Sequence, residues 1–193
     1  MIRAIVKFLI NIFCKIVFRV KKVGEENIQK EGAYIMCANH RSNWDPPILV
    51  ASTKRVLYIM AKEELFKNNF IRWFAKKCAV FPVKRGKMDI ESMKFSLKIL
   101  KEGQILMLFP EGTRHGLEKN GKAQNGAAFL ALRTGVPVIP VGIQGDMKPF
   151  HKVKLNYGKP LDFSKYQTNK PEKDLLDKVS KEIMDQIIML TKE

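Results

Sequence analysis

The sequence is poor in the residues that indicate a disulfide framework or a metal centre. Its three cysteines, Cys14, Cys37 and Cys78, lie in apolar runs without C-x-x-C spacing, so we expect buried thiols in a reducing compartment. The three histidines complete no metal-ligand pattern with them, and we expect neither a metal nor a bound cofactor. Low-complexity tracts and internal repeats are also lacking, and 193 residues suit one globular domain.

Acidic residues are scarce as well. The chain has 19 Asp and Glu against 35 Lys and Arg, which gives a formal net charge of +16. Such a surface attracts polyanions, which include nucleic acids, acidic proteins and anionic membranes, and charge alone does not choose among them. The basic runs lack interleaved aromatic residues that could stack on bases, so we expect no nucleic-acid partner.

The first 22 residues form a strongly apolar segment with a polar residue at every fourth position. These residues are Arg3, Lys7, Asn11, Lys15 and Arg19. On a helix, a step of four advances about 40°, so they form a narrow cationic stripe. The internal charges argue against a membrane span, and no small-residue cleavage site follows for a secretory signal. We expect an amphipathic helix at residues 1–22 that lies in an anionic membrane interface with its amines reaching the headgroups; a docking helix and a membrane span are the alternatives.

Apolar runs alternate with segments of helical periodicity from Gly24 onward, which predicts an α/β domain over residues 23–193. We expect strands at 33–38, 56–61, 79–83, 104–109, 136–141 and 152–161, and helices at 46–52, 62–77, 89–101, 126–134 and 171–190. This alternation favours a largely parallel central sheet with helices on both faces. Pro137 and Pro140 remove ladder donors, so we expect their strand near an edge or a bulge.

A histidine and an aspartate lie five residues apart in the segment after the first strand of this domain. On a regular helix His40 and Asp45 would point about 140° apart, and on a regular strand they would lie on opposite faces, so they meet only if the chain turns between them. A carboxylate in that arrangement can orient the imidazole as a general base. Because Pro46 follows, Asp45 is equally explained as a helix N-cap, with one oxygen capping and the other facing His40.

Two further polar clusters follow predicted strands, and ligands bind at such strand ends in parallel sheets. The loop after Phe109 contains Glu111, Gly112, Thr113 and Arg114. Arg114 suits a phosphate because its planar fork engages two oxygens, and Glu111 suits a polyol hydroxyl; a mutual pair between them is the structural alternative. The basic turn around Gly86 can cradle a phosphate or can be an ordinary solvated turn.

Four segments, in this order, resemble the sequence blocks of the glycerolipid acyltransferase family. They are NHRSNWD at 39–45, FPVKRG at 81–86, FPEGTR at 109–114 and VPVIPV at 136–141. The resemblance implies that His40 is a general base oriented by Asp45. It also implies that Arg85 and Arg114, helped by Lys84, bind the acceptor phosphate, that Glu111 and Gly112 position the glycerol, that Gly86 and Thr113 complete these substrate-binding loops, and that Pro140 shapes the acyl-donor side.

The reaction implied by the resemblance is direct transfer of a fatty acyl chain from coenzyme A or acyl carrier protein. The acceptor would be the free sn-2 hydroxyl of lysophosphatidic acid, and the product would be phosphatidic acid. No enzyme nucleophile is required, and the sequence pairs no cysteine or serine with the histidine. Another lysolipid acceptor is one alternative, and a non-catalytic basic protein that binds membranes or nucleic acids is another. The expected location is the cytoplasmic face of the cell membrane.

Overall fold

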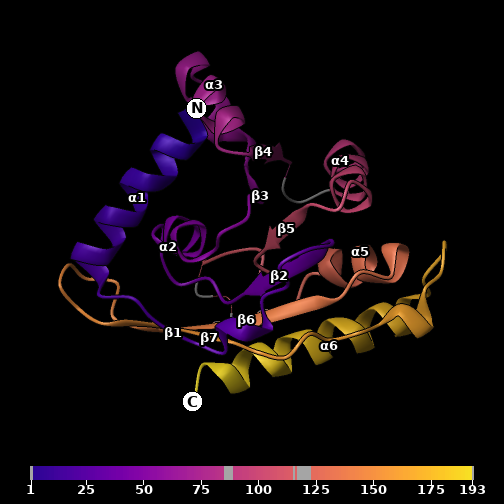
Figure 1. Ribbon diagram of the computed structural model, residues 1–193. Helices are drawn as coiled ribbons and strands as arrows, with labels where there is room; N and C mark the ends of the chain where they lie inside the picture. The colour runs from indigo at the N-terminus through magenta and orange to yellow at the C-terminus, as the bar shows by residue number, and fades with distance from the viewer. Residues whose placement is uncertain (1, 85–88, 115, 117–122, 193) are drawn as a thin grey trace.

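The computed structural model describes residues 2–84, 89–114, 116 and 123–192, which form a seven-stranded sheet flanked by helices (Figure 1). The strands are β1 (Lys21–Val23), β2 (Tyr34–Ala38), β3 (Leu57–Lys62), β4 (Val80–Val83), β5 (Ile105–Leu108), β6 (Val138–Gly145) and β7 (Val153–Tyr157). The α-helices are α1 (Ile2–Phe18), α2 (Asp45–Ser52), α3 (Asn69–Lys77), α4 (Ile90–Lys101), α5 (Gly126–Thr134) and α6 (Lys173–Leu190). The 3-10 helices are η1 (Glu25–Asn27), η2 (Glu63–Phe66) and η3 (Ser164–Tyr166).

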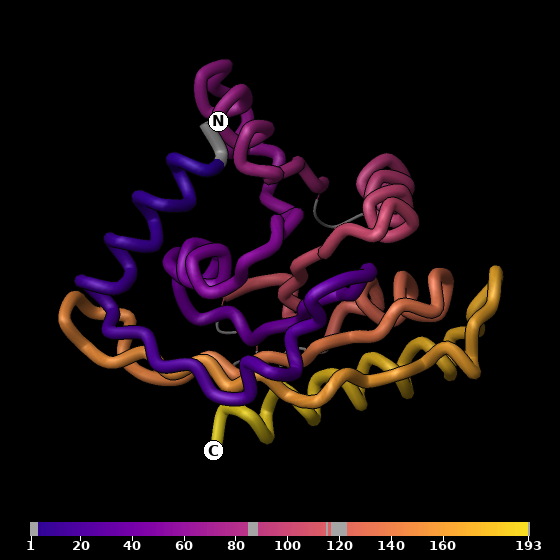
Figure 2. The backbone as a smooth tube through the Cα atoms, in the orientation of Figure 1, coloured from indigo at the N-terminus to yellow at the C-terminus, as the bar shows by residue number. Residues whose placement is uncertain are grey.

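The sheet is largely parallel, as predicted. Its order is β1-β7-β6-β2-β5-β3-β4, and each neighbouring pair is parallel except β6 and β7. The central strand β2 is buried along its whole length because α1 and α2 pack on one face of the sheet and α4, α5 and α6 on the other (Figure 2). The lack of polar alternation in this strand predicted burial on both faces.

Strand β6 does not lie at an edge of the sheet, so the edge position inferred from its prolines is wrong. It pairs with β2 on one side and with β7 on the other. Pro137 precedes the strand, and Pro140 lies where the ladder with β7 ends, since its carbonyl accepts a hydrogen bond from the N–H of Gly158, just beyond β7. In a strand, the N and O atoms of one residue point toward the same neighbouring strand. The nitrogen of Pro140 therefore faces the region just beyond the end of β7, and its missing N–H removes no hydrogen bond from the interior of the ladder.

The single helix predicted over residues 62–77 is also wrong, because the chain breaks between η2 and α3. Asn68 caps α3: its side-chain oxygen accepts hydrogen bonds from the N–H groups of Phe70 and Ile71. Asparagine favours this capping position over a helix interior. The break directs α3 away from the body of the protein, and none of its residues is buried.

The predicted N-terminal helix is present as α1, and it is partly docked on the domain. Cys14 and Phe18 are buried in the core that α1 shares with α2 and the sheet. Arg19 turns the chain with a positive φ of 39°, and β1 then pairs with β7. The expected boundary after residue 22 therefore falls inside a strand of the sheet.

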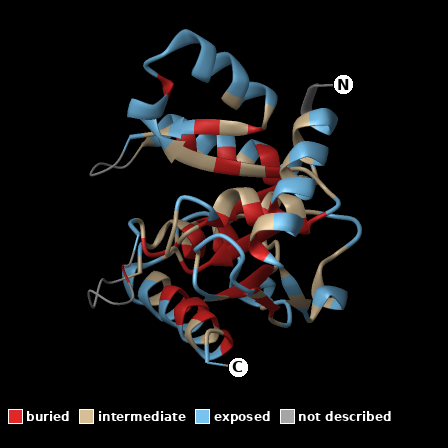
Figure 3. Cartoon of the chain, turned by 90° about the vertical axis from the view of Figure 1, so that its left-hand side faces the viewer, coloured by how far each residue is buried: buried red, intermediate tan, exposed pale blue. Residues whose placement is uncertain are grey.

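The outward side of α1 is exposed (Figure 3), and large apolar side chains cover much of it. Its exposed large side chains are Ile5, Phe8, Leu9, Ile12, Phe13 and Ile16. Lys7, expected to reach lipid headgroups, instead donates to the carbonyl oxygens of Lys54 and Arg55 at 2.7 and 3.2 Å, and burial lowers its pKa. In the described residues, no helix combines the length and hydropathy of a membrane span.

The closest approach between α6 and the sheet yields a stability prediction. A methyl group added at Gly142 in β6 would overlap the backbone carbonyl of Leu190 at the end of α6, whereas one added at Gly126, the first residue of α5, meets open space. Gly142→Ala should lower the free energy of unfolding by about 1–3 kcal/mol because the helix end must shift. Gly126→Ala is the control and should leave stability unchanged or slightly raised. Urea denaturation measures both, and equal stabilities would contradict the packing described.

Candidate functional site

The candidate site forms where two neighbouring strands end. β2 and β5 lie side by side and run parallel, so the segments after them meet at the same edge of the sheet. His40 follows β2 and Glu111 follows β5. Although they lie 71 positions apart, the backbone N–H of His40 donates to Oε1 of Glu111 at 2.8 Å. The structure therefore brings together the two motifs that sequence analysis placed at strand ends.

His40 and Asp45 meet, because the chain turns between them as the spacing requires. Nδ1 of His40 lies 2.8 Å from Oδ2 of Asp45, and the backbone N–H groups of Arg41 and Ser42 donate to the same oxygen at 2.7 Å each. Asp45 is fully buried, and 13% of the His40 side chain is exposed. Since the carboxylate accepts the Nδ1 proton, the lone pair of a neutral imidazole lies on Nε2.

Asp45 does not divide its oxygens in the way that the N-cap hypothesis predicted. It is the first residue of α2, and Trp44 holds the N-cap position without a side-chain hydrogen bond. The imidazole and the backbone donors all converge on Oδ2, while Oδ1 has no hydrogen-bond partner in the described part of the chain. The carboxylate therefore holds the histidine loop rather than capping the helix.

Two residues that sequence analysis gave no role also hold the loop. The ring of Phe109 stacks on the imidazole of His40, with centroids 4.0 Å apart and an interplanar angle of 17°. Asn39 bonds to the backbone of Ile143 in β6, donating to its carbonyl at 3.0 Å and accepting from its N–H at 2.7 Å. Asn39 directly precedes His40 and Phe109 opens the segment that contains Glu111, so membership in the quoted segments was the available signal.

The loop after β5 divides into a buried and an exposed part. Glu111 is buried beneath the histidine loop, while Thr113 and Arg114 are exposed. Gly112, between them, has a φ of +68°, which strains any residue with a Cβ. The exposed guanidinium is accessible to an anionic ligand, whereas one oxygen of Glu111 is already held by the backbone of His40.

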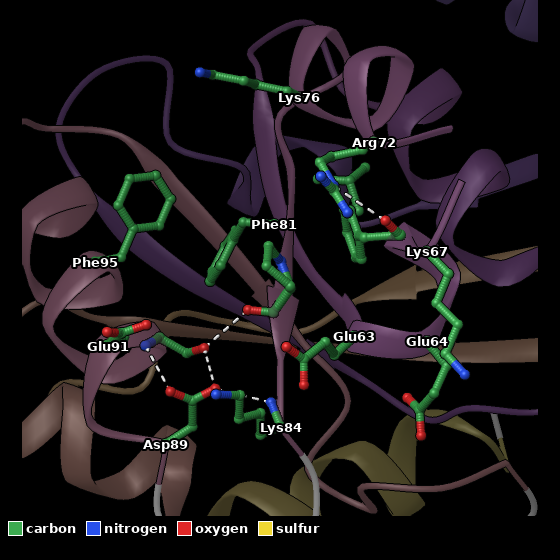
Figure 4. A pocket seen from close by; sticks show the side chains of 14 residues that line it. Glu63, Glu64, Lys67, Arg72, Lys76, Phe81, Lys84, Asp89, Glu91 and Phe95 are labelled. Carbon is green, nitrogen blue, oxygen red and sulfur yellow. Dashed lines mark hydrogen bonds between the residues drawn. The ribbon is translucent and has the colours of Figure 1, made fainter. Parts of the chain in front are cut away.

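Lys84 directly follows β4 and lines a cavity of about 840 Å³ that lies among η2, α3, β4 and α4 (Figure 4). Its backbone N–H donates to Asp89, the N-cap of α4, at 2.8 Å. This bond, together with those from Ser92, lowers the pKa of Asp89 to about 2, so its carboxylate stays ionised at neutral pH. Arg85 and Gly86 lie outside the described residues.

Pro140 lies within the sheet rather than at its open edge. It is buried in β6, with Cys37 of β2 as its Cα partner, three residues before His40. A separate apolar cavity of about 200 Å³, not anticipated from the sequence, lies between α1, α2, β3 and the end of α3. Pro46 and Pro47, which follow Asp45, line it together with Val6, Ile10, Val50, Leu57 and Phe74. Within the described ranges, no three His, Cys, Asp or Glu side chains group closely enough to hold a metal.

Comparisons with known proteins agree with this geometry. A family model described as Acyltransferase matches residues 19–144, which contain all four of the quoted segments. The 1-acyl-sn-glycerol-3-phosphate acyltransferase of Bacillus subtilis is 34% identical over 149 residues, covering 74% of this chain and 73% of that protein. The enzyme of the same name from Streptococcus pneumoniae is 35% identical over 138 residues, 68% of this chain, and the match spans about half (51%) of that longer protein.

A solved structure extends the similarity to the fold. The crystal structure of the 1-acyl-sn-glycerophosphate acyltransferase PlsC from Thermotoga maritima matches with a TM-score of 0.70 and 27% identity, covering 99% of this chain and 82% of that one. The family match includes both loops of the site as well as the strands that carry them. Sequence, fold and motif order thus agree, and the chain belongs to the acyltransferase family.

Proposed function

We propose that this protein transfers a fatty acyl chain from a thioester to the free sn-2 hydroxyl of lysophosphatidic acid, 1-acyl-sn-glycerol 3-phosphate, giving phosphatidic acid. The observation that carries the proposal is the His40–Asp45 pair at 2.8 Å, held at the edge of the sheet by backbone donors. The names of the relatives from Bacillus subtilis and Streptococcus pneumoniae support this choice of acceptor.

The chemistry follows from the tautomer that Asp45 selects. Nε2 of His40 takes the proton of the acceptor hydroxyl as its oxygen attacks the thioester carbonyl, and Asp45 stabilises the imidazolium that forms. The tetrahedral intermediate then collapses, the C–S bond breaks, and the imidazolium returns the proton to the departing thiolate. The carbonyl carbon passes directly between the two substrates, so no side chain of the enzyme becomes acylated.

The acceptor phosphate suits the exposed basic residues near this pair. We assign Arg114 to the phosphate, because guanidinium groups engage phosphate oxygens in pairs. Arg85 and Lys84 are assigned to the same role on the resemblance of their sequence segment. Gly112 and Thr113 lie between Arg114 and Glu111, where the glycerol would pass. Glu111 supports the reaction chiefly by fixing the backbone of His40.

The acyl chain and its carrier suit other parts of the surface. The 200 Å³ cavity is lined largely by apolar side chains, among them Pro46 and Pro47, which follow Asp45 in the sequence, so it suits an alkyl chain. Pro140 contributes by supporting the sheet under the site. Both coenzyme A and acyl carrier protein are anionic, and a net charge of +16 favours either carrier.

The outward apolar side of α1 supports attachment to a membrane. We propose that α1 lies in the interface of an anionic bilayer, on the cytoplasmic face, and presents residues 23–193 to lipid substrates. Both the acceptor and the product are amphiphiles, so an enzyme held at the bilayer surface need not extract them into water.

His40→Ala should reduce acyl transfer at least about 100-fold, since it removes the base. His151→Ala, at an exposed position, is the matched control and should retain full activity. Lipids formed from defined thioester donors and lysophosphatidic acid are quantified by mass spectrometry. Vesicle binding and the unfolding transition of the His40 variant should match the wild type. Substantial turnover by a folded His40→Ala protein would exclude His40 as the base.

Two substitutions of Glu111 test whether this residue positions His40 or binds the acceptor. Glu111→Ala leaves the His40 N–H without this acceptor and should lower the free energy of unfolding by about 1–3 kcal/mol, with a reduced kcat. Glu111→Gln keeps an acceptor oxygen and should retain most of both. Urea denaturation and steady-state kinetics measure the pair; an Ala variant as stable and as fast as the Gln variant would argue against the positioning role.

Arg114→Ala should raise the KM for lysophosphatidic acid about tenfold or more with a smaller effect on kcat, because a charge-assisted contact to the phosphate is lost. A panel of lysolipid acceptors provides the control. Acceptors whose phosphate is a diester should be poor substrates of the wild type and little affected by the substitution. Preferred transfer by the wild type onto such an acceptor would assign the protein to a different lysolipid.

A further inference from the structure

Helix α3 presents an aromatic face that the described part of the chain leaves uncovered. Phe70 is 69% exposed and Trp73 is 48% exposed, and none of the nine residues of the helix is buried. The ring of Phe70 lies 6.1 Å from that of Trp73 and 6.5 Å from that of Phe74, so the three form one surface. Ile71 and Leu65 add exposed apolar area beside them.

Such a helix needs a partner to be stable. Isolated helices shorter than about 12–15 residues are marginal in water, and helices in proteins gain their stability by burying an apolar face. The described contacts of α3 include the bond from Nε of Arg72 to the carbonyl of Phe66 at 3.1 Å, and Phe74 lines an apolar cavity that α3 shares with α1. Phe70 and Trp73 stay exposed in the described part of the chain, so this part of the apolar face is available to a partner.

The position of α3 indicates what that partner is. The N-terminal end of α1 lies beside α3 (Figures 1 and 2), and Val6 and Ile10 of α1 line the same apolar cavity as Phe74 of α3. Seen from the side on which α1 lies, both helices carry exposed residues (Figure 3). The outward apolar side of α1 and the aromatic face of α3 thus belong to neighbouring parts of one surface.

The charges of α3 fit an anionic bilayer. At about 100° per residue, Arg72 and Lys76 lie on the side of the helix opposite Phe70, and both are exposed, as is Lys67 just before it. Lys77, the last residue of α3, lies on the aromatic side. A face of aromatic residues with cations opposite and at the helix end is typical of a helix in a membrane interface, where tryptophan is enriched. A second copy of a chain with a charge of +16 would instead bring like charges together.

We propose that α3 is a second membrane-contacting element, which inserts the face formed by Phe70, Trp73 and Phe74 into an anionic bilayer beside α1. The inference rests on the proposed function because lipid substrates are the reason for membrane contact. If α1 and α3 both contact the bilayer at different points of the fold, the bilayer would fix the orientation of the catalytic domain as well as its distance from the membrane surface.

Tryptophan fluorescence tests the insertion directly, because the chain has two tryptophans, Trp44 and Trp73. In a Trp44→Phe protein, all tryptophan emission comes from Trp73. Vesicles of phosphatidylglycerol and phosphatidylcholine should shift this emission to the blue, and brominated acyl chains should quench it. A Trp44→Phe protein that co-sediments with these vesicles but shows neither shift nor quenching would overturn the proposal.

Side-chain truncation tests the energetic contribution. Phe70→Ala combined with Trp73→Ala should weaken partitioning onto the same vesicles about tenfold or more, since two large apolar side chains stay in water. Met189→Ala is the matched control: Met189 is 48% exposed on α6, on the other side of the sheet, and the variant should partition like the wild type. Equal partitioning of all three proteins would also overturn the proposal.

Further measurements separate this inference from its alternatives. Light scattering without lipid detects a second copy as the occupant: a dimer that the double substitution dissociates would refute the bilayer assignment. Acyl transfer to a detergent-dispersed acceptor should survive the Phe70 and Trp73 substitutions, whereas it requires His40. If the wild type transferred no acyl chain in this assay, the proposed function would be refuted. The vesicle measurements would still be a valid test of α3.

Discussion

The site depends on one buried carboxylate oxygen. Oδ2 of Asp45 accepts hydrogen bonds from two backbone N–H groups and lies 2.8 Å from the His40 ring, inside a residue with no exposed surface. An ionised group in such a place is costly unless donors surround it, and here the donors come from the loop that must turn. The interaction that orients the imidazole is therefore the same one that bends residues 40–45 into shape. Removing the carboxylate would cost the imidazole of His40 its fixed tautomer and the loop its conformation together.

Sheet topology supplies the rest of the frame, and that part was predictable. The runs that became β2 and β5 lack polar alternation, so sequence placed them inside a parallel sheet and placed His40 and Glu111 at its ligand-binding edge. The details were not predictable, because they depend on contacts between distant segments. The stacking of Phe109 on His40 and the anchoring of Asn39 on Ile143 have no local pattern. The edge position predicted from Pro140 was wrong for the same reason. An interior strand accommodates this proline because β7 ends beside it, which the local sequence does not reveal.

The amphipathic segments show a related limit of sequence. The composition of α1 predicted an interfacial helix, yet the pattern could not tell which side would dock: Cys14 and Phe18 entered the core, and Lys7 turned inward to backbone carbonyls. Around α3 the apolar spacing predicted one helix over residues 62–77, but Asn68 interrupts it, and Phe70 and Trp73 are exposed. Periodicity identifies an apolar face of a helix. Only the three-dimensional arrangement shows whether the rest of the protein covers that face or leaves it exposed.

The proposed membrane contact and the proposed catalytic site share a physical link at Trp44. Its ring lies 5.2 Å from that of Phe13 and 5.4 Å from that of Phe18, both in α1, and it immediately precedes Asp45. The C-terminal end of α1 is therefore packed against the loop that holds the base, while its N-terminal end lies beside α3. A bilayer that holds α1 and α3 thereby sets the position of His40 relative to the headgroups. For an acceptor whose reactive hydroxyl lies a fixed distance from its acyl chain, that position determines whether the hydroxyl can reach Nε2 while the chain stays in lipid.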